Sequence, residues 1–416
     1  MDGLSSEKLK IAMQVCLKHK VIPTVIGKEF EQDLEQDNEK KINSTKTFKL
    51  EELLNRKPVE VNMKPVREMI SGKVAMVTGG GGSIGSELCR QILKMEPSEL
   101  IILDHSELNL YLIGQELKDS TNVRLLLSDL KDSDGLAEAF IKYRPEVIYH
   151  AAAYKHVHLV ENNPYSSIIN NILGTKNLIE CALEFNTNYF VLVSSDKAVN
   201  PSSIMGSTKR VCELMVTSAA KSSGRRYCSV RFGNVLGSSG SLIPLLKNQI
   251  LAGGPVTVTD PNMVRYFMLI SEAVKLVLKA GQISSPGDIN VLKMGEPIKI
   301  LDLAKTVIRL MGKTEKEIPI VFIGMKPGEK LFEELYLNGN EATSEHPDIM
   351  VLPNGDSVYE PKCFMGEDLE FVVHKLIYLA YAHDEAALTL LKQLVFMHKH
   401  QSFMQDGKNQ KMGLVI

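Results

Sequence analysis

The stretch of sequence that decides the fold runs from Val74 to Asp104 and reads VAMVTGGGGSIGSELCRQILKMEPSELIILD. An apolar run of strand length leads straight into a glycine-rich turn, and an amphipathic helical pattern follows at once. Gly79, Gly82 and Gly85 keep the spacing G-x-x-G-x-x-G: the first allows a tight turn, the second lets the backbone approach a pyrophosphate, and the third lets helix and strand pack closely. This context predicts a dinucleotide site, with the pyrophosphate against the helix N-terminus.

Acidic residues after the next two strands indicate which dinucleotide binds. Asp104 ends the second strand, where a carboxylate accepts hydrogen bonds from the adenosine ribose hydroxyls. An acid there favours NAD over NADP, because it would repel a 2′-phosphate. Asp129 follows the third strand, where we expect it to face the adenine amino group. The structural alternative, a glycine turn in some other α/β protein, does not account for strand, glycines and acid together.

Apolar runs of strand length continue to alternate with amphipathic helical stretches as far as about residue 234. Such alternation predicts parallel strands joined by helices, and uninterrupted apolar strands are typical of a sheet covered on both faces. We therefore expect a Rossmann-like, doubly wound parallel α/β sheet of about six or seven strands, followed by a smaller C-terminal region. The expected domains are an N-terminal remnant or linker of a preceding nucleotide-fold domain (1–47), an NAD-binding Rossmann domain (48–235), a substrate-binding cap whose chain partly returns to the Rossmann core (236–400) and a tail (401–416).

Composition and charge exclude several classes of function. The chain has 416 residues, of which 44% are apolar and 24% charged, as is ordinary for a globular protein. Its formal net charge of -2 provides no basic field for nucleic acid or an anionic membrane. Six scattered cysteines without metal-ligand spacing predict reduced thiols and no metal site. The most apolar stretch, 371–382, is too short to span a membrane and contains His374 and Lys375, so we expect a soluble, cytoplasmic protein.

Several ordered motifs of this chain resemble a known family. The glycine turn with its preceding Thr78, the strand ending HAAA (150–153) and the later SSDKAVNPSSIMGSTKR (194–210) are similar to the extended short-chain dehydrogenases/reductases. The blocks RFGNVLGSSGSLIP, DPNMVRYFM, LKMGEPIKI and GMKPGEKLFEEL extend the resemblance from about residue 48 to 395. The branch resembled is the membrane-associated subgroup of UDP-N-acetylglucosamine 4,6-dehydratases. This implies a lyase that forms a UDP-2-acetamido-2,6-dideoxy-hexos-4-ulose for bacterial-type surface glycan biosynthesis.

The chemistry of a 4,6-dehydration requires an acid and a base close together. Hydride removal makes a C4 ketone, which acidifies C5–H. A base then takes that proton, an acid assists water loss from C6, and hydride returns to C6, so the resemblance implies tightly bound NAD that is regenerated in each cycle. Asp196 and Lys197 follow a strand at the sheet edge where ligands bind. By resemblance, Asp196 protonates the departing hydroxyl and Lys197 takes the C5 proton, and burial should raise the pKa of Asp196 and lower that of Lys197.

One position departs from the superfamily pattern Tyr-x-x-x-Lys. The spacing is kept from Met205 to Lys209, but methionine replaces the tyrosine that normally deprotonates the sugar hydroxyl, and a thioether exchanges no proton. The subgroup resembled carries the same methionine, and its lysine binds the nicotinamide ribose. The acceptor of the C4 hydroxyl proton stays open among Asp196, Lys197, Ser195 and a water. The residues implied in catalysis are Ser195, Asp196, Lys197, Met205 and Lys209, and those implied in cofactor binding are Thr78, Gly79, Gly82, Ser83, Ile84, Gly85, Asp104, Asp129, Leu130, Ala151, Ala152 and Lys209.

Further motifs suit a UDP-sugar. By resemblance, Asn234 lies near the substrate phosphates, and Arg265 clamps the pyrophosphate, a task that suits a guanidinium. Lys326 stands where the family more usually has arginine, and it neutralises phosphate with less geometric control. Glu329 would accept from the uridine ribose, and Lys155 and His156 should line the sugar site. Any one of these residues taken alone is typical of a solvated surface as much as of a binding site. The inference of a UDP-sugar site rests on the order in which the motifs follow one another in the sequence.

Two other functions remain as alternatives. A UDP-sugar 4-epimerase shares the cofactor cycle at C4, but epimerases of the superfamily normally keep the tyrosine and lack the Asp-Lys pair. A non-catalytic NAD-binding protein of the same fold would typically lose the acid/base residues, which are present here. As partners we expect UDP-N-acetylglucosamine and a second copy of the chain, in a homodimer or higher homo-oligomer. We expect no nucleic acid and no membrane span.

Overall fold

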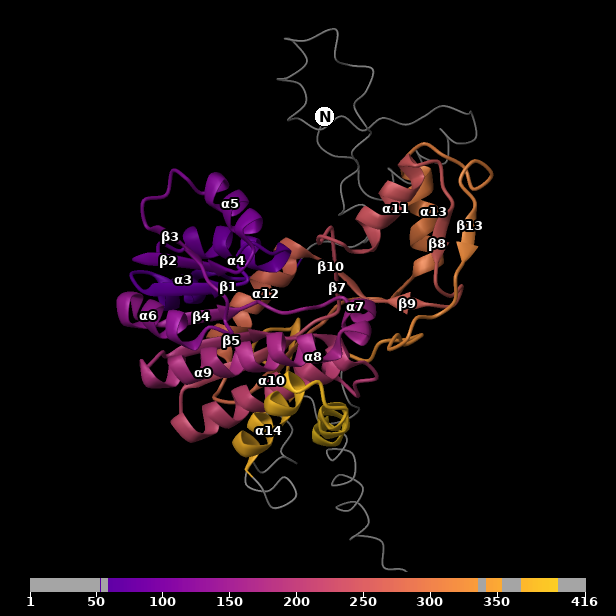
Figure 1. The fold of residues 1–416 in the computed structure, drawn as a ribbon. Coiled ribbons are helices and arrows are strands. Elements are labelled where there is room, and N and C mark those ends of the chain that lie inside the picture. Colours follow the sequence, from indigo (N-terminus) through magenta and orange to yellow (C-terminus); the bar gives the residue numbers. More distant parts are fainter. Residues whose placement is uncertain (1–52, 54–58, 336–341, 354–367, 396–416) are drawn as a thin grey trace, which may run out of the picture.

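The computed structural model describes residue 53 and residues 59–335, 342–353 and 368–395. The expectations for residues 1–47 and for the tail 401–416 lie outside these described residues. A twisted central sheet crosses the molecule (Figure 1). In the described part its strands are, from one edge to the other, β14 (Ala342–Thr343), β15 (Ile349–Leu352), β11 (Ile289–Leu292), β6 (Arg226–Arg231), β5 (Tyr189–Val193), β4 (Val147–His150), β1 (Val74–Thr78), β2 (Glu99–Asp104) and β3 (Val123–Leu127).

The sheet is larger than the sequence predicts. Its seven strands from β11 to β3 are parallel, and the order reverses between β1 and β4, which defines the switch point of a doubly wound fold. Two further strands, β15 and β14, are antiparallel and extend the edge, with Ile289 of β11 opposite Leu352 of β15. The expected six or seven strands must therefore be corrected to nine. The two added strands are short, and an apolar run of so few residues is not distinguishable from a loop in the sequence.

Helices cover both faces of the sheet, as a doubly wound fold requires. Two buried apolar clusters, one on each face, join strands to helices. The first face carries α3 (Lys64–Ile70), α4 (Ser83–Leu93), α5 (Glu107–Glu116) and α12 (Ile270–Ile283). The second face carries α6 (Ser133–Tyr143), α8 (Pro164–Ser167), the π-helix η3 (Ile168–Leu173), α9 (Gly174–Glu184), α10 (Ile204–Ser223) and α14 (Leu369–Tyr381). The fold class is thus the Rossmann-like α/β fold that the sequence predicts.

Local signals in the sequence account for the bounds of several helices. Ser106 precedes α5 and its hydroxyl accepts from the N–H of Asn109, which satisfies one free donor of the first turn. Ser203 does the same for α10 by accepting from the N–H of Gly206. Helix α10 ends at Gly224, whose φ of 68° lies in the left-handed region that glycine adopts without steric cost. These caps fix the start of α10 beside the carboxyl edge of the sheet.

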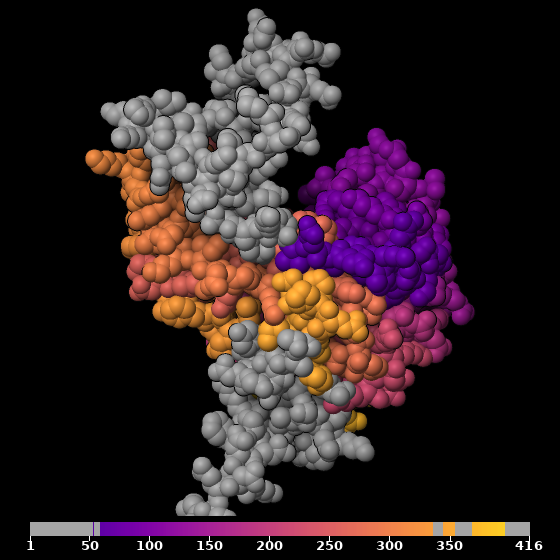
Figure 2. Space-filling model, turned by 180° about the vertical axis from the view of Figure 1, so that it is seen from behind, coloured from indigo at the N-terminus to yellow at the C-terminus, as the bar shows by residue number. Residues whose placement is uncertain are grey.

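A smaller lobe, which we call the cap, has an apolar core of its own (Figure 1). Strands β7 (Asn234–Leu236) and β10 (Phe267–Leu269) pair in parallel where the chain enters and leaves its first part. Space-filling atoms of the cap and of the first half of the sheet lie on opposite sides of the molecule (Figure 2). The elements of the cap are α11 (Leu242–Leu251), β8 (Val256–Val258), β9 (Val264–Arg265), β12 (Ile298–Lys299), α13 (Ile300–Leu310) and β13 (Ile320–Phe322).

The chain returns from the cap to the sheet twice, through α12 with β11 and through β15 with α14. Leu53 packs into the core of the cap. The division at residues 48, 236 and 401 remains our proposal for the domains. Within the described residues, no helix combines the length and the apolar character that crossing a membrane requires.

Candidate active site

The glycine turn after β1 has a geometry that needs its glycines. Gly79 has a φ of 67°, and a Cβ on it would lie 2.7 Å from the Cα of Ala152, at the end of the neighbouring β4. A Cβ on Gly85 would lie 2.0 Å from the carbonyl oxygen of Gly79, which also accepts from the N–H of Gly82 at 3.0 Å. Larger side chains would push helix α4 away from the turn. The turn therefore keeps the N-terminus of α4 open toward the sheet edge, as an anion site requires.

The two acids expected at the cofactor site differ in burial. Asp104 is buried, and its carboxylate accepts from the N–H of Gly81 at 2.9 Å and from the N–H of Ser106 at 2.9 Å. It therefore holds the glycine turn in place from the end of β2. The side chain of Asp129 is 40% exposed, and it forms an ion pair of 3.2 Å with Lys131. Leu130 is buried under α9.

The switch point between β1 and β4 contains a buried chain of polar side chains. Nδ1 of His150 lies 2.7 Å from Oγ1 of Thr78, and its Nε2 lies 2.9 Å from Oγ1 of Thr175. Burial lowers the pKa of His150 to about 3, with Lys209 adding to the effect, so the ring is neutral. The N–H of Ala151 donates to the carbonyl of Thr78. These contacts join the ends of the two strands at the place where Thr78, Ala151 and Ala152 were expected to meet a cofactor.

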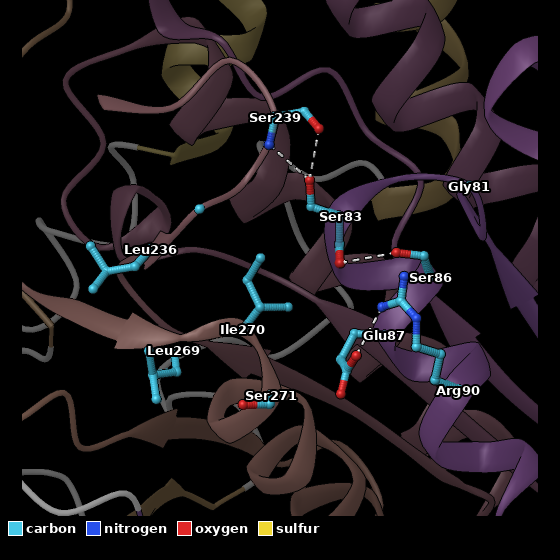
Figure 3. A pocket seen from close by; sticks show the side chains of 11 residues that line it. Gly81, Ser83, Ser86, Glu87, Arg90, Leu236, Ser239, Leu269, Ile270 and Ser271 are labelled. Atoms are coloured by element: carbon cyan, nitrogen blue, oxygen red, sulfur yellow. Dashed lines mark hydrogen bonds and ion pairs between the residues drawn. The ribbon is translucent and has the colours of Figure 1, made fainter. Parts of the chain in front are cut away.

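Two cavities adjoin this edge. One of about 440 Å³ lies between the first turns of α4 and the segments after β7 and β10 (Figure 3). In it, Oγ of Ser83 accepts from the N–H of Ser239 at 2.9 Å, and Nζ of Lys155 donates to the carbonyl of Ser239 at 3.1 Å. The loop containing Ser239 thus bridges the glycine turn and the segment after β4. The second cavity, of about 490 Å³, includes Lys155 and His156 among its lining residues.

Asp196 and Lys197 lie together at the carboxyl end of β5, in the short helix η4 (Asp196–Ala198). Nζ of Lys197 is 2.9 Å from Oδ1 of Asp196, and that same oxygen accepts from the hydroxyl of Ser195 at 2.9 Å. The other oxygen of Asp196, Oδ2, is buried and has no hydrogen-bond partner among the described residues. It lies close to Gly233, whose added Cβ would be 3.1 Å away. The two carboxylate oxygens of Asp196 thus differ, because Oδ1 holds Lys197 and Ser195 while Oδ2 holds neither.

The expected charge state of Lys197 must be corrected. Burial alone acts to lower its pKa, as the sequence predicts, but the carboxylates of Asp196 and Glu333 outweigh burial and raise the pKa. Lys197 is therefore an ammonium in this structure. Glu333, which the sequence did not single out, places Oε1 3.7 Å from Nζ of Lys197 and 3.6 Å from the guanidinium of Arg265. Burial, with Asp196 nearby, raises the pKa of Glu333 against the opposing effect of the three cations around it.

The Met205–Lys209 segment forms the first turns of α10. Met205 is buried, so the structure places a thioether where the superfamily has a phenol. Nζ of Lys209 donates to the carbonyl of Val193 at 2.8 Å, at the end of β5, and burial lowers the pKa of Lys209. A Cβ on Gly206 would lie 2.2 Å from the carbonyl oxygen of Lys197. This glycine lets α10 approach the Asp196–Lys197 turn.

Arg265 is buried in β9 and is already engaged. Its Nη1 donates to the carbonyls of Val264 at 2.7 Å and Leu331 at 3.2 Å, and its Nη2 donates to the carbonyl of Lys330 at 2.8 Å. Together with the Glu333 contact, this connects Arg265 to Lys197 and Asp196. A guanidinium with several carbonyl partners stays oriented, and it can exchange a carbonyl for a stronger anionic acceptor.

The remaining residues expected at the substrate lie at the entrance of the cap. Asn234 begins β7 and its N–H donates to the carbonyl of Tyr266. Lys326 is exposed, and its N–H donates to the carboxylate of Glu329 at 3.0 Å, so Glu329 closes a turn. The structure brings neither Lys326 nor Glu329 into a contact with Asp196 or Lys197. Their roles toward a nucleotide remain predictions.

Asn171 is a second residue that sequence reasoning missed. It lies in the π-helix η3 and binds both backbone groups of Tyr154: its Oδ1 accepts from the N–H at 2.8 Å and its Nδ2 donates to the carbonyl at 3.1 Å. Its Nδ2 also donates to Thr208 in α10 at 3.0 Å. Asn171 therefore fixes the segment that carries Lys155. A buried asparagine in an apolar helix was the available signal, since such an amide needs partners.

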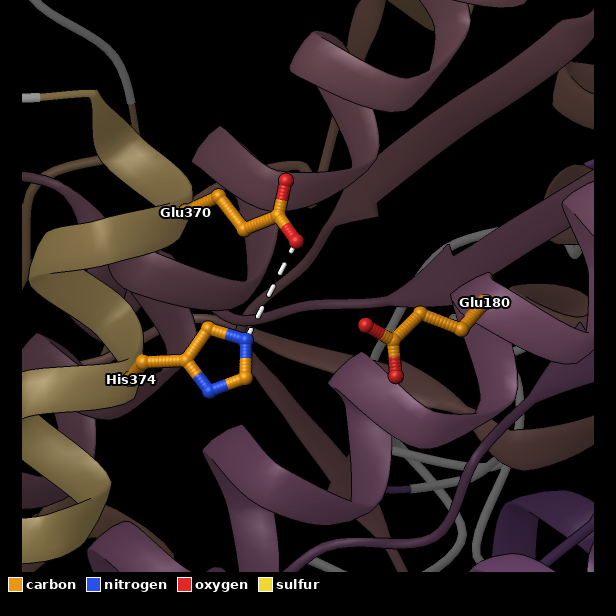
Figure 4. Close-up of side chains that lie close together, drawn as sticks. All are labelled: Glu180, Glu370 and His374. Carbon is orange, nitrogen blue, oxygen red and sulfur yellow. Dashed lines mark ion pairs between the residues drawn. The ribbon is translucent and has the colours of Figure 1, made fainter.

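A group of ionisable side chains lies away from this edge (Figure 4). Glu180 of α9 and Glu370 and His374 of α14 bring one ligand atom each within 4.8 Å of one another. All three are exposed, and Glu180 pairs with Lys176 at 2.5 Å. Exposed groups of this kind are common without an ion, so we assign them no role in the site.

Comparison with known proteins gives relatives over most of the chain. Residues 75–354 match the model of the family described as "Polysaccharide biosynthesis protein". The capsular polysaccharide biosynthesis protein CapD of Staphylococcus aureus is 46% identical over 82% of this chain and 56% of its own length. The probable polysaccharide biosynthesis protein EpsC of Bacillus subtilis is 50% identical over 71% of this chain and 50% of its own. The chain thus spans about half the length of these two relatives. A UDP-glucose 4-epimerase of Rickettsia canadensis is 32% identical over 67% of this chain and 81% of its own.

Solved structures match the same region. Pen from Bacillus thuringiensis has 35% identity and a TM-score of 0.64, covering 70% of this chain and 90% of its own. The dTDP-glucose 4,6-dehydratase DesIV from Streptomyces venezuelae, a double mutant solved with NAD, has 22% identity and a TM-score of 0.57, covering 63% of this chain and 88% of its own. At this identity the second likeness supports the Rossmann-like fold alone.

Proposed function

Because this chain belongs to the family of polysaccharide biosynthesis proteins, we propose that it is an NAD-dependent nucleotide-sugar 4,6-dehydratase. Its substrate is UDP-N-acetylglucosamine, its product a UDP-2-acetamido-2,6-dideoxy-hexos-4-ulose, and its role the synthesis of a surface glycan. The observation that carries the proposal is the contact of Lys197 and Ser195 with the buried carboxylate of Asp196 at the carboxyl end of β5. Ligands of such sheets bind at this edge, beside the switch point.

The residues around the glycine turn suit NAD. A Cβ on Gly79 or Gly85 would collide with backbone atoms of Ala152 or of Gly79, so these glycines keep the turn tight against the start of α4, and Asp104 is an acid where a 2′-phosphate would be repelled. Lys209, at the end of β5, would hold the nicotinamide ribose. NAD held there would supply the reversible hydride transfer that a 4,6-dehydration requires. Its tight retention between cycles is part of the proposal.

The protonation state required for the reaction is one proton transfer away from the ion pair in the structure. A dehydration needs neutral Lys197 as the base and protonated Asp196 as the acid, and the ion pair has the same total number of protons. Moving one proton over the 2.9 Å from Nζ to Oδ1 converts one state into the other. Lys197 then takes the C5 proton, and Asp196 gives its proton to the departing C6 hydroxyl. With Met205 in place of a phenol, the groups proposed to accept the C4 hydroxyl proton are Asp196, Lys197, Ser195 and a bound water. Asp196 or Lys197 would have to pass that proton on before the elimination.

Arg265 is the proposed clamp for the diphosphate. It is buried, points toward the acid/base pair through Glu333, and holds carbonyls that an anionic acceptor can replace. Asn234, Lys155 and His156 would complete the sugar and phosphate sites, and Lys326 and Glu329 the nucleoside end. The proposed assembly is a homodimer or higher homo-oligomer.

The alternative reaction is a 4-epimerisation, for which the 32% identity to a UDP-glucose 4-epimerase is the specific observation. Both reactions need a group that takes the proton of the C4 hydroxyl, and in neither can the thioether at position 205 do so. Epimerisation differs in what it needs at C6. It has no need of an acid at C6, where Asp196 is proposed to act. A non-catalytic role would not explain why Lys197 pairs with the buried Asp196, because removing such charges from water costs free energy.

Proton NMR of the purified chain with UDP-N-acetylglucosamine in deuterated water tests the reaction. The expected result is a new C6 methyl signal, a C4 ketone or its hydrate, and deuterium at C5. UDP-N-acetylgalactosamine as the product would establish the epimerase instead. Bound NAD with no turnover would reject this substrate.

The role of Lys197 is tested by Lys197→Ala, with the exposed Lys313→Ala as the matched control. We expect Lys197→Ala to lower kcat by about 10²- to 10⁴-fold, the usual contribution of a general base, while UDP binding is retained. Single-turnover absorbance of reduced NAD separates the steps, because C4 oxidation precedes loss of the C5 proton. Unchanged turnover in Lys197→Ala would remove it from the mechanism.

A further inference from the structure

Glu333 has a position that none of the roles above explains. Its side chain is only 4% exposed, and its Oε1 lies between two cations that belong to different parts of the proposed site. Nζ of Lys197 is 3.7 Å away on the side of the acid/base pair, and the guanidinium of Arg265 is 3.6 Å away on the side of the proposed diphosphate clamp. A carboxylate shared by two cations connects the surroundings of one to the other, so a ligand at Arg265 changes the field at Glu333 and Lys197.

The segment that carries Glu333 also holds Arg265 by its backbone. The carbonyls of Lys330 and Leu331 accept from Arg265, and the ammonium of Lys330 adds a further positive charge near Glu333. Lys197, Asp196, Arg265 and Lys330 are therefore the charged groups that face Glu333 in the described part of the chain. Without a ligand, Asp196 and Glu333 balance Lys197 and Arg265, and the third cation, Lys330, pairs with Glu334 at 3.3 Å, so the cluster is close to neutral.

We propose that Glu333 couples diphosphate binding at Arg265 to the charge of the Asp196–Lys197 pair, by taking up a proton when the nucleotide binds. The inference rests on the proposed function, because it requires a diphosphate at Arg265. A bound diphosphate adds negative charge to a buried cluster that was balanced. It also occupies Arg265, which until then favoured the charged form of Glu333. Both effects favour the protonated carboxyl, and the proton comes from solvent.

The protonation of Glu333 has a consequence for catalysis. A charged Glu333 stabilises the ammonium of Lys197 and so opposes the transfer of its proton to Asp196. Once Glu333 is neutral, Lys197 loses one of its two carboxylate partners. The N–H bond of Lys197 then breaks and an O–H bond of Asp196 forms more readily, which gives the neutral base and the protonated acid. Glu333 is thus a positioning residue that acts through Lys197, and the substrate itself prepares the pair.

Isothermal titration calorimetry with UDP as the probe tests the coupling. Titrations in two buffers of different ionisation enthalpy, at about pH 7.5 and so above the second ionisation of a terminal phosphate near pH 6, give the number of protons taken up. The test variant is Glu333→Gln, which is neutral and similar in shape. Glu334→Gln is the matched control, because Glu334 is the next residue in the sequence and its side chain is exposed. Wild type and Glu334→Gln should take up more protons than Glu333→Gln, by up to about one per site.

Each outcome decides the matter. Equal proton uptake by all three proteins would overturn the role of Glu333 while leaving the proposed function intact. No binding of UDP to the wild type would reject the proposed substrate class, and the coupling with it. Circular dichroism shows whether Glu333→Gln folds. If it does not, the wild type is measured alone. Proton uptake on binding requires the affinity of the wild type for UDP to increase as pH falls from 8.5 toward 7, by up to about tenfold per pH unit. A pH-independent affinity over that range would also overturn the proposal.

Discussion

Individual buried residues at the carboxyl edge of the sheet keep charge states that their surroundings impose. Glu213 of α10 is fully buried, yet Arg231, Arg210 and the hydroxyl of Ser194 hold its pKa down to about 2 against the opposing effect of burial. His150 is equally buried but has only hydroxyl partners, so it stays neutral. The difference is the presence of a counter-charge within hydrogen-bond distance, because burial opposes charge in both residues.

The neutral state of His150 predicts a pH dependence of stability. Its pKa is about 3 in the folded protein, and 6.5 is the ordinary value expected for the unfolded chain. As pH falls below 6.5 the unfolded chain binds a proton that the folded protein does not, so the free energy of unfolding decreases. From linkage we expect a loss of about 2 kcal/mol between pH 6.5 and 5. Urea unfolding at several pH values measures this, and His150→Asn should show a shallower slope. An equal slope in both proteins would contradict a neutral His150.

At the scale of elements, the site depends on how closely α10 approaches η4. Gly206, in the first turn of α10, has no side chain, and the carbonyl oxygen of Lys197 occupies the space where a Cβ would lie, at 2.2 Å. A backbone atom cannot move aside as the end of a side chain can. An added Cβ would therefore force α10 and η4 apart, and the 2.9 Å contact of Lys197 with Asp196 would change as η4 moves.

Gly206→Ala is therefore expected to lower both stability and turnover. Overpacking against a backbone group typically costs about 1–3 kcal/mol. Gly114→Ala in α5 is the control, since its Cβ would meet only the side-chain end of Leu125, at 2.4 Å, and Leu125 is 47% exposed. Alanine favours a helix over glycine by about 1 kcal/mol, so this variant should be neutral or stabilised. Denaturant unfolding gives the free energy of unfolding of both variants, and kcat gives their turnover. Equal effects of the two substitutions would refute the steric argument.

At the scale of the whole molecule, α14 and a helix over residues 386–395 complete the second face of the sheet. Helix α14 packs on η3 and α8, and its apolar residues join the same buried cluster as those of α9 and α10 (Figure 1). A chain segment that follows the cap thus returns to seal the Rossmann core.

Two substitutions in α14 separate the buried from the exposed side of this helix. Leu376 is fully buried, and Leu376→Ala should lower the free energy of unfolding by about 2–5 kcal/mol, because it leaves a cavity. Tyr378 is 73% exposed, and Tyr378→Ala should change the free energy of unfolding by less than about 0.5 kcal/mol. Urea denaturation gives both values. A small loss for Leu376→Ala would mean that α14 is not part of the cooperative core.

Much of this fold follows from local patterns. The glycine turn needs only neighbouring residues to form, and the apolar runs of the parallel strands need only to be long enough to be seen. The turn, the seven parallel strands and the adjacent Asp196 and Lys197 were therefore predictable. Strands β14 and β15 were not, since each is short and is stabilised by the edge it joins.

The sequence by itself determined the fold class, and it placed the glycine turn after β1 and Asp196 with Lys197 after β5, because these depend on residue types at fixed spacing. The tertiary structure alone decided the charge of Lys197. Glu333 follows Lys197 only after the whole cap, and nothing local indicates that its carboxylate ends 3.7 Å from the ammonium. Since a pKa depends on the balance of burial against nearby charges, and those charges come from distant parts of the chain, only the folded molecule sets it.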